Sequence, residues 1–272
     1  MEKCKLPHSP DIRAERGTLI LRQATGSAEI EACQRLRYRV FYEERGASIA
    51  GKKIDSDRFD AFCDHLVVVQ TADVPGTDAI RLTDGELIGT YRLLRQEVAE
   101  ANGGFYTQHE FDIAPLIKAH PELRFLELGR SCVLRPFRTK PVVELLWQGI
   151  WNYVRAHSMD VMLGCASLEG TDPQAHALAL SFLAQAAPPP EWSVKALPNR
   201  AIDMRRVAAE RIDQRAALRD LPPLVKGYLR LGCYIGEGAV IDQDFNTIDV
   251  LIILPVSAIN ARYFAHFGQP ND

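Results

Sequence analysis

The order of apolar segments along the chain constrains its fold more than any other feature. Residues 66–70 (LVVVQ) and 86–95 (ELIGTYRLLR) are typical of strands. Segments with apolar residues at helical spacing run from about 26 to 45, 142 to 157 and 173 to 186. Neighbouring strands with a short link predict antiparallel pairing, and later strand–helix–strand units predict a parallel pair. The sequence therefore predicts an α/β fold, with a mixed central sheet between layers of helices.

The remaining segments complete this order. Further strands are expected at 18–24, 123–134, 161–166 and in the apolar run that ends at Pro255, with short helices within 97–122 and a charge-laced helix at 203–220. We expect residues 1–17 to form an N-terminal tail. A single enlarged domain follows over 18–272, with a core of about 18–187 and a C-terminal extension of about 188–272.

Composition excludes several classes of protein. Apolar residues make up 47% and charged residues 25% of the chain, as in ordinary globular proteins, and a net charge of −3 gives no indication of nucleic-acid binding. The longest apolar run, 250–259, is interrupted by Pro255 and is shorter than the roughly 20 residues that cross a bilayer. The first 16 residues contain no apolar stretch typical of a secretory signal. Six cysteines without zinc-like spacing predict reduced thiols and no metal site. We therefore expect a cytoplasmic protein.

Four polar segments contain the candidate chemistry. They are RYRVFYEE (37–44), RFDAFCDHL (58–66) with Asp60, Asp64 and His65, GTYRLL (89–94) with Arg92, and ELGRSC (127–132) with Glu127 and Arg130. Residues three apart on a regular strand point to opposite faces. Glu127 and Arg130 can therefore share one pocket only if Gly129 marks a β-bulge. The alternative is that both are edge charges or members of a buried ion pair.

In combination, these segments resemble the GNAT-like branch of acyltransferases that includes the acyl-homoserine-lactone synthases. The branch has an RxxVF helix end, acidic residues before the second strand, G-x-x-R-L-L and E-L-[SG]-R in that order, and this chain matches over roughly 19–166. Residues 163–173 (LGCASLEGTDP) and 222–255 are similar to the tail of the ornithine-lipid acyltransferases. The resemblance then covers most of the chain.

This resemblance implies an N-acyltransferase that uses acyl-carrier protein. The implied reaction transfers a 3-hydroxyacyl group to the α-amine of L-ornithine and gives lyso-ornithine lipid. A homoserine-lactone-type synthase, which needs S-adenosylmethionine, and a catalytically silent acyl-carrier-binding protein are the alternatives. No bound cofactor is expected, since the donor is carried on the phosphopantetheine of the carrier protein.

Roles for the candidate residues follow from this reaction. Glu127 is the candidate base, and a bulge on its strand would offer a backbone N–H to the oxyanion. Arg92 or Arg130 would bind the ornithine carboxylate, although Arg92 could instead pair with a protein carboxylate such as Asp60. Asp60 or Asp64 would receive the second ammonium group. His65, beside Asp64, is included among the substrate-binding candidates.

The loop before the helix at 142–157 is the candidate site for the phosphopantetheine phosphate. Arg135, Arg138 and Lys140 supply positive charge there, and a helix N-terminus favours anions. A solvated basic loop is the alternative. The arginines of 203–219 could extend the docking patch, or belong to a plain solvated helix. Residues 256–267 (VSAINARYFAHF) could contact the inner face of the membrane, or form part of the core.

Overall fold

The computed structural model describes residues 12–44, 53–72, 80–186, 188–259 and 263. The strands are β1 (Arg13–Arg16), β2 (Leu19–Gln23), β3 (Asp64–Gln70), β4 (Ile80–Leu82), β5 (Gly85–Arg95), β6 (Phe125–Val133), β7 (Val161–Glu169), β8 (Ala201–Ile202), β9 (Tyr234–Ile235), β10 (Ala239–Asp242) and β11 (Thr247–Pro255). The helices are α1 (Gly26–Tyr38), α2 (Gln96–Ala101), α3 (Ala114–Ala119), α4 (Lys140–Ala156), α5 (Ala177–Leu183), α6 (Gln214–Asp220) and α7 (Pro223–Leu231). No helix within these ranges is long and apolar enough to cross a membrane.

The strands form one mixed sheet in the order β1-β2-β3-β5-β6-β7-β11-β10-β8, with β4 beside β5 and β9 beside β11. Strands β3, β5 and β6 pair antiparallel, and β6 pairs parallel with β7 through α4. The predicted mixed α/β sheet is therefore confirmed. The residues that follow 188 add β8–β11 to the same sheet, next to β7.

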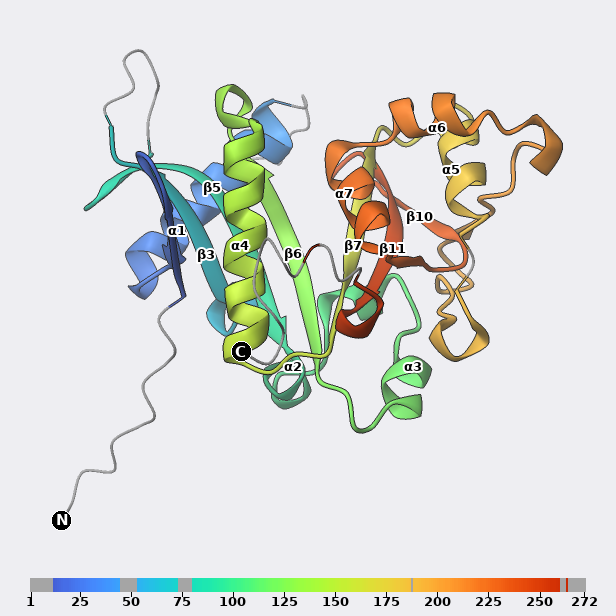
Figure 1. Cartoon of the computed structure of the whole chain (residues 1–272), viewed down its shortest axis with the longest axis horizontal. Coiled ribbons are helices and arrows are strands. Elements are labelled where there is room, and N and C mark those ends of the chain that lie inside the picture. Colours follow the sequence, from blue (N-terminus) through green and yellow to red (C-terminus); the bar gives the residue numbers. More distant parts are fainter. Residues whose placement is uncertain (1–11, 45–52, 73–79, 187, 260–262, 264–272) are drawn as a thin grey trace.

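Helices cover both faces of the sheet (Figure 1). The apolar face of α4 packs with α7 and with one face of the sheet around Leu126, Val250 and Ile252. The other face carries two smaller clusters, one under α1 and one under the connection that contains α2 and α3. Because side chains alternate along a strand, Phe125 and Glu127 share this second face, whereas Leu126 and Leu128 face α4.

Strands β6 and β7 pair only at their beginnings. Their parallel register runs from Phe125↔Val161 to Glu127↔Leu163 and ends there. At that point a side chain at Gly164 would lie 2.2 Å from the carbonyl oxygen of Leu128, so glycine permits the last close approach. Beyond it the two strands separate, with β5 still paired to β6 and β11 still paired to β7. The sheet therefore has a gap in its middle.

Three segments differ from the sequence prediction. Residues 13–16 of the expected tail form β1, because Gly17 adopts φ +60° and lets the chain turn back to pair with β2. The expected helix at 173–186 is α-helical only as α5. The expected helix at 203–220 reduces to a single 3₁₀ turn and α6, because the carboxylate of Asp213 accepts the amides of Arg215 and Ala216 and starts α6 there. Residue 45, the predicted end of the first helix, lies outside the described residues.

Candidate active site

A cavity of about 400 Å³ occupies the gap between β6 and β7. Its wall includes Glu127 and Arg130 from β6, Cys165 and Ser167 from β7, and Trp147 from α4. Residues of both sheet faces contribute, since Glu127 belongs to the face under α2 and α3 and Trp147 to the opposite side. The cavity therefore connects the two faces through the sheet.

Glu127 is buried at the narrow end of this gap. Its two carboxylate oxygens accept the backbone N–H groups of Tyr106 (3.0 Å) and Thr107 (2.6 Å). Burial raises the pKa of Glu127, and a hydrogen bond from the Thr107 side chain, the two amides and Arg92 oppose this effect. A buried carboxylate with a raised pKa that lines a cavity is suited to accept a proton.

The predicted bulge is present one residue beyond Gly129. Gly129 pairs with Arg92 and Cys132 pairs with Thr90, so Arg130 and Ser131 stand opposite a single residue of β5. Arg130 takes a left-handed conformation, with φ 51°, which is uncommon for any residue other than glycine. This irregularity turns the Arg130 side chain into the cavity beside Glu127.

Three of the predicted site residues, Asp60, Arg92 and Arg130, belong to one buried ion-pair cluster, which we call the paired cluster. Its members are Arg37, Asp55, Asp57, Asp60, Arg92 and Arg130. Arg37 is fully buried and lies 2.7 Å from a carboxylate oxygen of both Asp55 and Asp60. Arg92 lies 2.6 Å from Asp57 and 3.0 Å from Asp60. The cluster balances three guanidinium groups against three carboxylates.

This geometry bears on two of the predicted substrate contacts. Asp60 is not among the residues that line the cavity, and its carboxylate is already bound by Arg37 and Arg92, which hold its pKa well below the usual range against the effect of burial. Arg92 lines the cavity but pairs with protein carboxylates, as in the alternative stated above. Its role as a carboxylate clamp stays a prediction.

Asp64 and His65 lie apart from the cavity. Asp64 is the first residue of β3 and points to the α4 face, where it accepts hydrogen bonds from Tyr153 (2.5 Å) and Gln23 (2.7 Å). His65 points to the other face and lies 3.8 Å from Asp60. Burial and the neighbouring Arg37 lower the pKa of His65 to about 4, so the ring is neutral. Neither residue is placed to touch a substrate in the gap.

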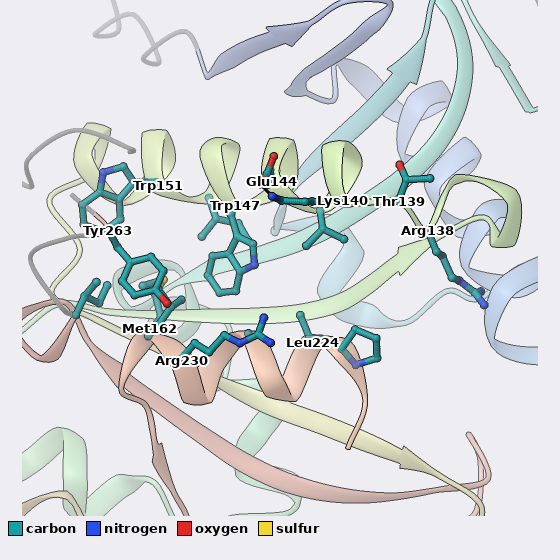
Figure 2. Close-up of a pocket in the computed structure, with 16 residues that line it drawn as sticks. Arg138, Thr139, Lys140, Glu144, Trp147, Trp151, Met162, Leu224, Arg230 and Tyr263 are labelled. Carbon is teal, nitrogen blue, oxygen red and sulfur yellow. Dashed lines mark ion pairs between the residues drawn. The ribbon is translucent and has the colours of Figure 1, made fainter. Parts of the chain in front are cut away.

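A second, larger cavity of about 710 Å³ lies between α4 and α7. Its wall is mainly apolar, with Trp147, Ile150, Trp151 and Leu231 among the lining residues (Figure 2). It shares lining residues with the cavity in the gap, namely Arg138, Val143, Trp147, Ile150, Pro223 and Leu224. The groove between α4 and α7 is therefore continuous with the cavity in the gap between β6 and β7.

The predicted basic loop lies at one end of this groove. Figure 2 shows Arg138 and Thr139 at the end where α4 begins, and Trp151 and Tyr263 at the other end. Arg138 donates to the carbonyl of Val133 (3.0 Å) and pairs with Glu44. Lys140 is 85% exposed and 3.4 Å from Glu144. Arg135 is exposed and lies outside the groove-lining residues. An unpredicted cation, Arg230 of α7, lies on the rim.

Sequence analysis did not identify an acidic group on the far side of the gap, which we call the acidic cluster. It consists of Glu110, Asp242, Asp249 and the thiol of Cys165. One ligand atom each of Glu110, Cys165 and Asp249 lies within 4.8 Å of the others. The only signal in the sequence was Asp249, which interrupts the apolar face of a strand that otherwise reads as core. That Asp249 of β11 lines the cavity can be seen only in the three-dimensional structure.

The cavity-lining thiols are not activated. Burial raises the pKa of Cys132 above the ordinary range, and burial with Glu110 and Asp249 also raises the pKa of Cys165 well above it. A thiol that stays protonated is a poor nucleophile and a poor metal ligand. The arrangement suits direct transfer of an acyl group to an amine.

Comparisons with known proteins agree with this geometry. The acetyltransferase (GNAT) domain family matches residues 36–148. The L-ornithine N(alpha)-acyltransferase of Agrobacterium fabrum is 51% identical over 93% of this chain and 86% of its own length. The enzyme of the same name from Brucella abortus is 50% identical over 93% of this chain and 89% of its own. FeeM, an N-acyl amino acid synthase from uncultured soil microbes, shares the fold at 11% identity, with a TM-score of 0.52 over 90% of this chain and 97% of its own. The chain therefore belongs to the L-ornithine N(alpha)-acyltransferase family of GNAT-fold acyltransferases.

Proposed function

We propose that this enzyme transfers a 3-hydroxyacyl group from acyl-carrier protein to the α-amine of L-ornithine and releases lyso-ornithine lipid. Ornithine is supported by the names of the relatives that match most of the chain. The carrier-bound donor and the 3-hydroxyacyl group rest on the family resemblance of the sequence. The observation that carries the proposal is the cavity that crosses the sheet beside Glu127 and continues into an apolar groove.

The two faces of the sheet offer different chemistry to the two substrates. The groove between α4 and α7 has an apolar wall with two tryptophans, which suits an acyl chain. The opposite side of the gap carries Glu127, Arg130 and Asp249, which suits an amino acid with charged groups. The thioester carbonyl and the amine would then meet inside the gap, where the strands have separated.

The phosphopantetheine arm would enter at the beginning of α4. Arg138 and Lys140 line the groove there, and the N-terminus of a long helix favours a phosphate. Arg230 adds charge on the opposite rim. Acyl-carrier proteins are acidic, so this basic rim gives a docking surface at the entrance. Arg135 would contribute only to the outer part of that surface.

Glu127 would accept the proton of the attacking amine. An ornithine α-amine is largely protonated at neutral pH, so a base increases the reactive fraction. The amine nitrogen forms the amide bond as the carbon–sulfur bond of the thioester breaks. The nitrogen loses two protons between the ammonium and the amide: one is released to solvent, and the other passes through Glu127 to the departing pantetheine thiolate. A backbone amide of the Arg130–Ser131 bulge is the candidate donor to the oxyanion.

An assay with defined donors tests this proposal. Purified enzyme is incubated with a 3-hydroxyacyl-carrier protein and L-ornithine, and mass spectrometry identifies the product. We expect N-acylornithine, with acyl-coenzyme A as a poorer donor. Formation of a lactone only when S-adenosylmethionine replaces ornithine would establish the alternative synthase activity. Carrier-protein binding without any acyl transfer would establish a non-catalytic role. Either result would overturn the proposal.

A further inference from the structure

The acidic cluster buries three carboxyl groups with few cationic partners among the described residues. Glu110 is 2% exposed, and Asp242 and Asp249 are each 6% exposed. Among the described residues, the ion pairs within 4.0 Å give Glu110 one partner, Arg200, at the long distance of 3.9 Å, and give Asp242 and Asp249 none. Burying carboxylates without a matching cation is costly. Such a cost is expected where a ligand supplies the missing charge.

One oxygen of this cluster has no hydrogen-bond partner at the usual distance in the described part of the chain, although the weak donor thiol of Cys165 interacts with its carboxyl group. Glu110 Oε2 is buried without a hydrogen bond, and its carboxylate lies beside Cys165 and Asp249. Asp249 is better satisfied, because one of its oxygens accepts from Thr247 at 2.9 Å. An unpaired acceptor on a nearly fully buried side chain is uncommon and requires an explanation. A donor from outside the protein would satisfy it.

The acidic cluster adjoins the proposed reaction centre. Cys165, Asp242 and Asp249 line the same cavity as Glu127. Glu110 follows the 3₁₀ turn Tyr106–His109, whose first amides bind Glu127. Glu127 and Glu110 are thus held by one short loop, and the other three members of the acidic cluster line the cavity that Glu127 lines, whereas Glu110 does not.

We propose that Glu110 and Asp249, with Asp242 beside them, bind the side-chain ammonium group of the acceptor amino acid. The inference rests on the proposed function, because it assigns one charged group of that substrate to one part of the site. With the α-amine at Glu127, the short methylene chain of the acceptor directs its second ammonium toward the acidic cluster. The C-terminal strands β10 and β11 then determine which amino acid is acylated, and the β6 side performs the transfer.

A metal ion fits the same atoms less well. Burial and the neighbouring carboxylates hold the pKa of Cys165 well above its usual range, so the thiol keeps its proton. Transition metals bind the thiolate form, and release of that proton would be costly here. An ammonium group needs only acceptor oxygens, which Glu110 and Asp249 provide. An ammonium ligand therefore leaves the Cys165 thiol protonated, and its positive charge favours the ionised form of the two carboxyl groups.

The test compares L-ornithine with L-norvaline, which has the same carbon chain but lacks the δ-amine. Both acceptors are assayed with the wild-type enzyme, Asp249→Asn and Glu110→Gln, with Asp112→Asn as an exposed control two residues from Glu110. We expect the wild type to favour ornithine by about 10- to 100-fold in kcat/KM, as for a charged hydrogen bond. Each cluster variant should lose most of this preference through a higher KM for ornithine, whereas norvaline turnover and the control change little.

Thermal shift measurements separate this inference from the proposed function. Ornithine should raise the melting temperature of the wild-type enzyme more than norvaline does, and each cluster variant should lose that difference. This readout needs no turnover, so an inactive wild-type enzyme would overturn the proposed function while the thermal shifts still decide the ammonium site. Equal responses to ornithine and norvaline, or cluster variants that keep the preference, would overturn the inference. Loss of the preference on treatment with EDTA would instead establish a metal site.

Discussion

The paired cluster and the acidic cluster lie on the same face of one sheet and are both buried, yet their charges are arranged in opposite ways. The paired cluster matches three arginines with three aspartates, at distances of 2.6–3.2 Å. The acidic cluster has three carboxylates and one distant arginine. A balanced set can hold α1, β5 and β6 together without a ligand. An unbalanced set lowers the stability of the protein unless a cation binds. The acidic cluster is therefore the better indicator of a binding site.

Removing the central cation of the paired cluster should have the largest effect. Arg37→Met leaves Asp55 and Asp60 buried without their main partner, so we expect the free energy of unfolding to fall by about 3–5 kcal/mol. Urea titration measures this change. Arg35→Met on the same helix is the matched control, because its pair with Glu31 is exposed and contributes little. A cluster that tolerates Arg37→Met as well as Arg35→Met is not holding the fold together.

The next largest effect should come from Glu127, which lines the same cavity as members of both clusters. Glu127→Gln keeps one oxygen for a backbone amide, places its NH2 group against the other amide and removes the base, so kcat should fall about 100-fold or more in enzyme that still folds but melts somewhat earlier. Steady-state turnover with acyl-carrier protein and ornithine measures this. The exposed Glu122→Gln serves as the control. Near-normal turnover in folded Glu127→Gln enzyme would remove this residue from the mechanism.

The burial of the acidic cluster should make the free energy of unfolding depend on pH. Burial raises the pKa of Glu110 to about 7, and the groups facing it are Asp249, Cys165, Asp242 and Arg200. An acid with a raised pKa holds its proton more tightly in the folded state, so stability is lost as pH rises from about 4.5 to 7. Glu110→Gln removes this loss. Its stability relative to wild type should therefore increase by about 1–3 kcal/mol between pH 4.5 and pH 8.

Thermal or urea unfolding at the two pH values measures that increase, with the exposed Glu100→Gln as the control. The free energies of unfolding of wild type and Glu110→Gln could differ by the same amount at both pH values. That result would mean that burial of the ionised Glu110 does not destabilise the fold. The acidic cluster would then resemble the paired cluster, and the contrast between them would disappear.

The smallest effect is expected outside both clusters, at the entrance of the groove. Arg138→Glu combined with Lys140→Glu should lower kcat/KM for the acyl-carrier protein by about 10-fold at low salt, and the loss should shrink as salt screens the attraction. The KM for ornithine should stay unchanged. Arg211→Glu with Arg215→Glu is the matched control. If the control pair loses the same salt dependence, the carrier protein docks on α6 instead.

Much of the fold could be predicted from the sequence because it depends on local patterns. Apolar and β-branched runs predicted β3, β5 and β6, and the helix between β6 and β7 predicted their parallel pairing. The bulge was predicted only as the condition under which Glu127 and Arg130 share a cavity, with a buried ion pair as the alternative. The structure has the bulge, and Arg130 also belongs to a buried ion-pair cluster. The tail and the helix at 203–220 were less successful, because a turn at Gly17 and a cap at Asp213 decide them.

The division of the polar residues could not be predicted. Asp60 and Asp64 are close in sequence but face opposite sides, because Asp64 is already the first residue of β3. Glu110 and Asp249 meet only because β11 pairs with β7 under the loop that follows α2. No spacing along the chain reports a contact of that kind. A cluster with matched charges can be distinguished from one with unmatched charges only in the folded structure, where these distant segments lie together.

The central claim is that the acyl chain and the amino acid reach the gap from opposite faces of the sheet. A co-crystal structure with an N-acylornithine that carries bromine at the end of its acyl chain tests this directly. We expect the anomalous signal of the bromine in the groove between α4 and α7, near Trp147 or Trp151, and the ornithine ammonium within hydrogen-bond distance of Asp249 or Glu110. Bromine and ornithine on the same face of the sheet would contradict the account.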